Sequence, residues 1–167
     1  MLNAANISLI GMPGAGKSTV GVLLAKALAW SFLDTDLMIQ VAEERSVREI
    51  IRTEGIERFV GIEQRHVLAL NRREHVIATG GSVVCGPAAI EHLKSLSTVV
   101  HLDLPLAVLQ RRLAGLNGLG IVLGPGQTIA GIFQHRYPLY RRYADLTVEC
   151  IGRTQEEIVD EILAGVR

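Results

Sequence analysis

The stretch GMPGAGKST, residues Gly11–Thr19, follows a β-branched apolar run and precedes a segment with apolar residues at helical spacing. It matches the pattern G-x-x-x-x-G-K-[ST], in which a glycine-rich turn joins a strand to a helix. The glycines let backbone N–H groups turn toward phosphate oxygens, and the following helix adds the positive end of its dipole. Lys17 can reach the terminal phosphates and Ser18 can ligate magnesium. An ordinary strand-to-helix turn needs only one glycine, whereas this stretch has three glycines followed by Lys-Ser at the spacing of the pattern. We therefore predict an ATP site formed by Gly11, Gly14, Ala15, Gly16, Lys17, Ser18 and Thr19.

Short apolar strands alternate with longer helical stretches on both sides of this loop. Strands are expected at 7–10, 31–33, 76–79, 98–102 and 146–150, and helices at 18–29, 37–44, 47–52, 55–71, 88–95, 106–113, 129–142 and 155–164. Strands separated by helices indicate parallel pairing through right-handed crossovers. The segment from Gly115 to Gln127 contains five glycines and is expected to be a mobile loop. The pattern predicts an α/β fold in a single domain over residues 1–167.

The composition of the chain argues against some classes of function. The chain has 167 residues, 49% of them hydrophobic, and a formal net charge of zero. Zero net charge offers no electrostatic case for nucleic acid or a membrane surface, and no apolar run is long enough to span a bilayer. Without a secretion signal, Cys85 and Cys150 are expected to be reduced thiols. We expect a cytoplasmic monomer.

A second candidate constellation is the pair Asp34 and Asp36, at the end of the second expected strand. Parallel sheets bind ligands at this edge, and alternate residues of an extended segment share a face. One carboxylate could hold magnesium, and the other could orient or deprotonate a hydroxyl. Alternatively, one of them caps the following helix. The neighbouring phosphate loop favours the functional interpretation.

Weaker candidates are arginines and a glycine pair. Arg111 and Arg112 precede the glycine-rich loop and could face the nucleotide, or could be solvated helix surface. Arg136 could reach the same cleft, although a helix C-terminus favours any cation. The run TGGS contains Gly80, Gly81 and Ser82 at the end of the third expected strand. Glycines there leave backbone open to a ligand.

The chain resembles the shikimate kinase family over nearly its whole length. The phosphate loop, the Asp-x-Asp pair, a helix with Phe59 and Glu63, the ATGGS strand end and the Arg136-x-Pro-Leu-Tyr segment occur in the family's order. The resemblance implies a nucleoside-monophosphate-kinase-like P-loop fold, with a five-stranded parallel sheet, helices on both faces and a lid near 115–127. It also implies transfer of the γ-phosphoryl group of ATP, with Mg²⁺, to a hydroxyl of a small molecule.

The resemblance implies a role for each matching residue. Catalytic roles fall to Lys17, Asp36 and Arg136, and Ser18 and Asp34 would hold magnesium. Nucleotide contacts would also come from Arg111 or Arg112 and from Arg153, and acceptor contacts from Asp36, Gly80, Gly81, Ser82 and Arg136.

Three departures fall on the acceptor and lid side. The family has arginine after the helix aromatic, where this chain has Val60, and a third glycine where it has Ser82. Between Arg112 and Arg136 there is no Lys or Arg. These departures leave three hypotheses: phosphorylation of shikimate with a weakened carboxylate clamp, phosphorylation of another small hydroxylated metabolite, or a nucleotide-binding protein that has lost catalysis.

Overall fold

The computed structural model describes residues 5–116 and 121–166. The strands are β1 (Asn6–Ile10), β2 (Ser31–Asp34), β3 (His75–Ala78), β4 (Thr98–Asp103) and β5 (Leu146–Glu149). The helices are α1 (Lys17–Leu28), α2 (Thr35–Glu43), α3 (Val47–Glu54), α4 (Ile56–Leu68), α5 (Pro87–Leu96), α6 (Leu106–Ala114), α7 (Ile129–Tyr143) and α8 (Gln155–Gly165), with a short 3₁₀ turn, η1, at Val83–Cys85.

The strands form one sheet with the order β2-β3-β1-β4-β5. Every neighbouring pair is parallel; Ile7 of β1, for example, lies between Val76 of β3 and Thr98 of β4. Chain order reverses around β1, so β1 and its following loop lie at the switch point where ligands bind in such sheets.

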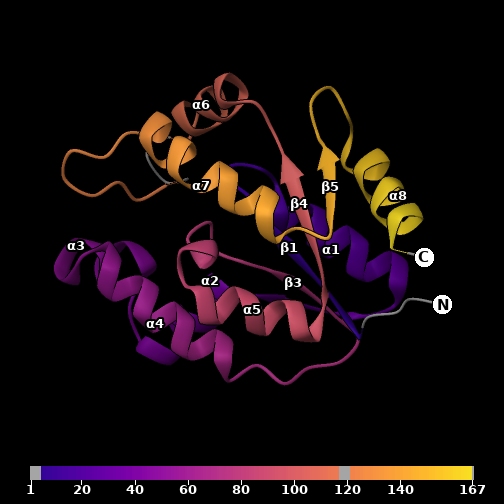
Figure 1. Cartoon of the computed structure of the whole chain (residues 1–167), viewed down its shortest axis with the longest axis horizontal. Coiled ribbons are helices and arrows are strands. Elements are labelled where there is room, and N and C mark those ends of the chain that lie inside the picture. The colour runs from indigo at the N-terminus through magenta and orange to yellow at the C-terminus, as the bar shows by residue number, and fades with distance from the viewer. Residues whose placement is uncertain (1–4, 117–120, 167) are drawn as a thin grey trace.

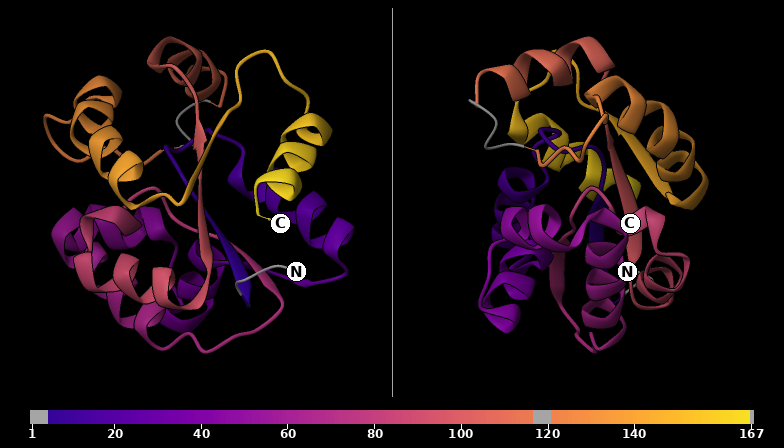
Figure 2. Two further views of the ribbon diagram at one scale, coloured as in Figure 1. Left: turned by 45° about the vertical axis from the view of Figure 1, so that its right-hand side comes forward. Right: turned by 90° about the vertical axis from the view of Figure 1, so that its left-hand side faces the viewer.

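Helices cover both faces of the sheet (Figures 1 and 2). Helices α1 and α8 pack on one face, and α4, α5 and α7 lie on the other. The central strands β1 and β4 are therefore buried on both sides, and all of β1 and the four middle residues of β4 are buried. The structure confirms the predicted five-stranded parallel α/β fold.

Most differences from the sequence expectation lie at element ends. Helix α4 stops at Leu68 rather than near residue 71, and β5 ends at Glu149 rather than at Cys150. The turn η1 was not expected. Of the expected lid, 115–127, residues 117–120 lie outside the described residues. Among the helices in the described ranges, none has the length and apolar character needed to cross a bilayer.

Candidate active site

The glycine-rich loop lies between β1 and α1 at the carboxyl edge of the sheet. Gly14 and Gly16 adopt positive φ values of 83° and 94°, which side chains disfavour, and Gly16 is the N-cap of α1. The Lys17 ammonium folds back and donates to the carbonyl oxygens of Gly11 at 2.8 Å and Met12 at 2.9 Å. The loop is therefore already wrapped around a positive charge that a phosphate could engage.

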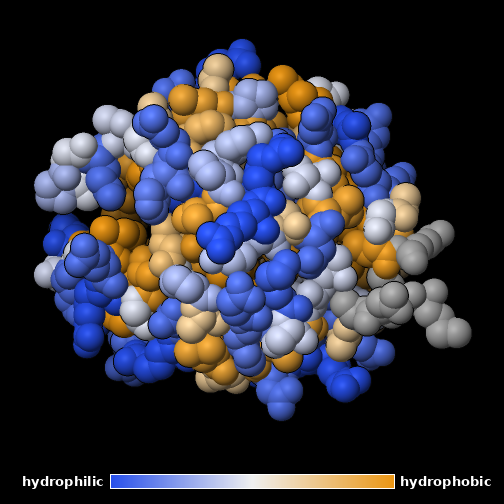
Figure 3. Space-filling view, viewed as in Figure 1, coloured by the Kyte–Doolittle hydropathy of each residue, from blue (hydrophilic) through white to orange (hydrophobic). Residues whose placement is uncertain are grey.

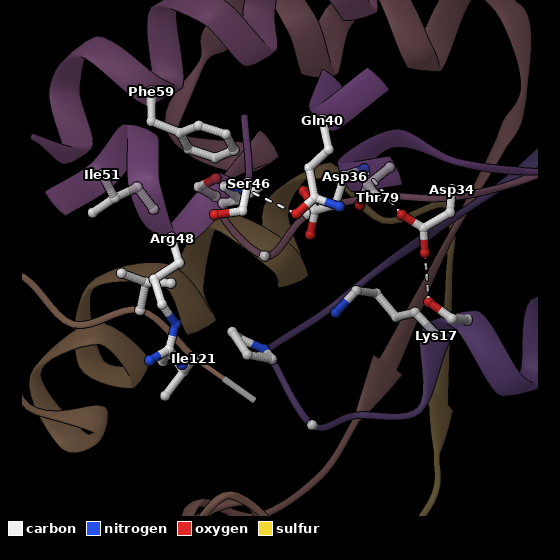
Figure 4. Close-up of a pocket in the computed structure, with 18 of the residues that line it drawn as sticks. Lys17, Asp34, Asp36, Gln40, Ser46, Arg48, Ile51, Phe59, Thr79 and Ile121 are labelled. Atoms are coloured by element: carbon white, nitrogen blue, oxygen red, sulfur yellow. Dashed lines mark hydrogen bonds between the residues drawn. The ribbon is translucent and has the colours of Figure 1, made fainter. Parts of the chain in front are cut away.

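Lys17 is only 8% exposed. Burial lowers its pKa to about 8, while the carboxylates of Asp36 and Asp34 act in the opposite direction. Figure 4 shows Lys17 and Asp36 pointing toward one another across the cavity. The pair thus places a cation and a carboxylate in one cavity.

Asp34 caps α2, which is one of the alternatives that the sequence left open. Its Oδ1 accepts hydrogen bonds from the backbone N–H groups of Asp36 at 3.0 Å and Leu37 at 3.2 Å, so it caps α2. Its Oδ2 accepts from the Ser18 hydroxyl at 2.7 Å. The capping bonds fix the carboxylate and leave its second oxygen beside the phosphate loop.

Asp36 lies in the first turn of α2 and faces the end of β3. Burial raises its pKa, and the nearby charge of Asp34 adds to the increase while Lys17 opposes it. Its Oδ1 is buried and has no hydrogen-bond partner among the described residues. A Cβ atom at Gly80 would lie 2.6 Å from this oxygen, so glycine is required there. Oδ1 of Asp36 is therefore directed at the end of β3, where Gly80 has no side chain.

Glu63 of α4 is the other carboxylate at this strand end. It is 1% exposed, and its Oε2 accepts a 2.7 Å hydrogen bond from the hydroxyl of Ser82. Burial raises the pKa of Glu63 to about 8. Ser82, expected to line the acceptor site as a replaced glycine, lies in the cavity wall and uses its hydroxyl to hold Glu63.

This burial predicts a specific pH dependence of stability. The folded protein holds the proton of Glu63 up to about pH 8, whereas the ordinary pKa is 4.5. The folded state therefore binds more protons between these values, and stability falls as pH rises, at up to about 1.4 kcal/mol per pH unit. We expect Glu63→Gln to remove this slope in urea unfolding measured from pH 5 to pH 8. Glu91 is an exposed residue of α5, so Glu91→Gln should leave the slope of stability against pH unchanged. An unchanged slope in Glu63→Gln would contradict the raised pKa of Glu63.

Arg136 enters the site from α7. It is 7% exposed, and one of its guanidinium nitrogens, Nη1, lies 3.3 Å from where a Cβ of Gly81 would be. The hydroxyl of Tyr140, one turn later, donates to the carbonyl of Gly81 at 2.5 Å. This contact ties α7 to the end of β3 and fixes the distance between Arg136 and the glycine pair.

One cavity of about 580 Å³ joins these groups. Its described lining includes Lys17, Ser18, Asp34, Asp36, Gly80, Gly81, Ser82 and Arg136, together with Gln40, Arg48, Ile51, Phe59, Ile121 and Val122. The structure therefore brings together the phosphate loop and the predicted acceptor residues (Figure 4).

The arginines predicted to contact the nucleotide lie outside this lining. Arg111 and Arg112 of α6 are both exposed, and Arg112 donates from Nη1 to the carbonyl of Gly14 at 3.1 Å. Arg153, in the turn after β5, pairs with Glu161 of α8. The charges of both Arg112 and Arg153 act on the buried Cys150. Of the two, Arg112 lies against the phosphate loop through its bond to Gly14.

A second cavity, of about 540 Å³, adjoins the first. Val60, Cys85, Ile132 and His135 line it, and Arg136 borders both cavities. Figure 3 shows a hollow with hydrophobic walls between the segment before α7 and helices α3 and α4. Val60 and Arg136 both line this cavity, and the valine side chain has no group that could form a hydrogen bond with Arg136.

Sequence reasoning missed some of these positions. Glu63 was noted in the family pattern but not assigned to the site, and Gln40, Arg48 and Ile51 were not considered. The helical spacing of Phe59 and Glu63, four residues apart, was the available signal, because it places both on one face of α4.

Comparison with known proteins gives a consistent result. The family model described as Shikimate kinase matches residues 13–167. Shikimate kinase from Mycobacterium ulcerans is 38% identical, covering 93% of this chain and 86% of the relative, and that from Synechococcus is 39% identical, covering 97% and 84%. The solved structure of shikimate kinase from Acinetobacter baumannii in complex with shikimate has a TM-score of 0.88 and 30% identity, covering 97% and 92%.

Proposed function

Because the chain belongs to the shikimate kinase family, we propose that it is an ATP-dependent kinase that transfers the γ-phosphoryl group to a hydroxyl of shikimate. The single observation that supports this most is the shared cavity, in which Lys17 of the phosphate loop faces Asp36 at the end of β3. A donor phosphate and an acceptor hydroxyl bound at these groups would lie next to each other.

The residues divide the chemistry between them. Asp36, with its buried unpartnered oxygen, accepts the proton of the attacking hydroxyl. Lys17 exchanges its bonds to the loop carbonyls for bonds to donor phosphate oxygens and stabilises the charge of the transferring group. Gly80 and Gly81 let the acceptor approach the backbone, and Arg136 binds its carboxylate.

The residues present fit a magnesium ion. Ser18 and Asp34 place two oxygen ligands within 2.7 Å of each other beside the loop, and Mg²⁺ prefers oxygen ligands shared with substrate phosphates. Among the described residues, no group of three or more His, Cys, Asp or Glu side chains could hold a metal. Magnesium bound with ATP would neutralise phosphate charge, and Ser18 and Asp34 would position it.

The nucleotide contacts follow from the loop and its flanks. The phosphate contacts come from Gly11, Gly14, Ala15, Gly16, Lys17, Ser18 and Thr19. Arg112 is better placed than Arg111 for the base, because it reaches the Gly14 carbonyl. Arg153 would have to leave its ion pair with Glu161 to contact nucleotide.

A second candidate is the same reaction on a less anionic hydroxylated metabolite. The observation that favours it is Val60, which lines the cavity beside Arg136 but cannot bind a carboxylate. Loss of catalysis is disfavoured by the presence of both aspartates and the complete phosphate loop.

A coupled assay of ADP release separates these candidates. Shikimate and a panel of neutral polyols and other hydroxy acids would each be supplied with ATP and Mg²⁺. We expect turnover that is fastest with shikimate. Faster turnover of a neutral polyol would support the second candidate, and ADP binding without turnover of any acceptor would support a non-catalytic protein.

The segment 115–127 is proposed to act as a lid. Ile121 and Val122 already line the cavity, and closing over bound ligands would exclude water from the transfer. We expect slower hydrogen exchange of the amides at 121–127 when ATP and shikimate are both bound than in the free protein. Exchange that is equally fast in both states would rule out a lid.

The remaining features are proposals that rest on the sequence. We infer a single domain over residues 1–167, a monomer, a cytoplasmic location, and no nucleic-acid or membrane partner. The two cysteines are free thiols in the structure, which fits a reducing compartment.

A further inference from the structure

One cationic side chain in the cavity lining, that of Arg48, has no role in the proposed phosphoryl transfer. Lys17, Arg48 and Arg136 are the cationic side chains in the described cavity lining. Lys17 belongs to the phosphate loop, and Arg136 is buried against Gly81. Arg48 lies on α3, and Figure 4 shows it on the other side of the cavity from Lys17.

The position of Arg48 places it among acceptor-side residues. Its neighbours in the lining include Ile51 of the same helix and Ile56 and Phe59 of α4. In Figure 4 it projects from the α3 end of the cavity on the side of Ile121, whereas Lys17 projects from the phosphate loop. A long cation at this end can reach an anionic group of the acceptor.

Helix α3 adds a physical reason for an anion at this place. Arg48 lies in its first turn, two residues after the N-cap Ser46, whose hydroxyl accepts from the N–H of Glu49 at 3.1 Å. A cation near a helix N-terminus is disfavoured by the helix dipole, and an anion there is favoured. The positive end of α3 would therefore also favour a carboxylate bound beside Arg48.

Two other arginines, Arg58 and Arg65, lie on α4 but do not line the cavity. Arg58 pairs with Glu54 at 3.4 Å, and Arg65 pairs with Glu43 at 2.5 Å. Both arginines are exposed and absent from the described cavity lining. Neither therefore replaces the arginine that the family carries at the position of Val60.

We propose that Arg48 is a specificity-determining residue that binds the carboxylate of the acceptor, together with Arg136. This inference rests on the proposed function, because it names the contact of a carboxylate-bearing acceptor in the same cavity. In this arrangement the second arginine that binds the carboxylate comes from α3. The arginine that the family carries at the position of Val60 would come from α4.

Steady-state kinetics of Arg48→Ala test the proposal. We expect the KM for shikimate to rise about 10-fold, the loss expected for one hydrogen bond to a charged group. The KM for ATP and kcat should change by less than about 3-fold, because Lys17 and Asp36 remain. Arg48→Lys should recover part of the affinity, because it keeps the charge without the planar guanidinium.

Two comparisons identify the anion. With a shikimate analogue whose carboxylate is replaced by a neutral carboxamide, Arg48→Ala and the wild type should have the same KM. Val60→Arg should lower the raised KM of Arg48→Ala, because the second cavity leaves room for an arginine facing Arg136. Arg58→Ala is the matched control for loss of a nearby surface charge and should behave as wild type.

Several results would overturn the inference. An unchanged shikimate KM in Arg48→Ala would do so, as would an equal loss with the carboxamide analogue. A fall in kcat at constant shikimate KM would assign Arg48 to the transferring phosphoryl group instead. Thermal unfolding of each variant would confirm that it is folded. If the wild type itself does not turn over shikimate, the proposed function fails, which is distinct from failure at Arg48 alone.

Discussion

Asp36→Asn is expected to lower kcat with shikimate by ~10²–10⁴-fold, the usual contribution of a general base. The carboxamide keeps the size of the side chain but cannot take the hydroxyl proton. The affinity for ADP should change little, because the nucleotide is held by the loop. Rapid-quench measurement of phosphoryl transfer, with calorimetry of ADP binding, gives the two quantities separately.

Asp160→Asn is the control for this substitution, because Asp160 is an exposed carboxylate of α8 outside the described cavity lining. It should leave both quantities unchanged. Full turnover in Asp36→Asn would remove Asp36 from the chemistry. The loss of the cap of α2 could not explain a defect, because Asp34 supplies the side-chain cap.

Lys17→Ala is expected to weaken ATP and ADP binding by about 100-fold or more, because at least two charge-assisted hydrogen bonds to phosphate are lost. The domain should stay folded. Lys17 is a buried cation whose pKa is lowered to about 8, so its removal relieves a desolvation cost. Calorimetry with ADP measures the binding, and thermal unfolding measures the fold.

Lys26→Ala provides the matched control, because Lys26 is an exposed lysine in the last turn of the same helix, α1. Its nucleotide affinity should equal that of the wild type. Unchanged ADP binding in Lys17→Ala would defeat the assignment of the loop.

The parts of the site that the sequence predicted are those fixed by local geometry. The glycine-rich loop is a contiguous turn between β1 and α1, so its residue types reveal it. The convergence of Asp34 and Asp36 with the loop follows from the common edge of parallel strands. The fold was predictable for the same reason, since alternating strands and helices permit few topologies.

The missed parts depend on packing between distant segments. The bond between Ser82 and Glu63 requires α4 to lie against the end of β3. The choice between Arg111 and Arg112 depends on the rotation of α6 against the loop. Arg48 lines the cavity only because α3 forms part of the cavity wall. No periodicity in a single sequence encodes these placements.

The open space beside Val60 has a consequence for inhibitor selectivity. Arg136 borders both cavities, so a compound with a carboxylate head in the first could extend an apolar arm past Arg136 into the second. In a kinase with the arginine that the family carries after the helix aromatic, that side chain would compete for the same volume. The arm would bind here by contact with Val60 and Ile132 and be rejected there. The valine at position 60 thus allows the design of a ligand that binds this kinase more tightly than its relatives.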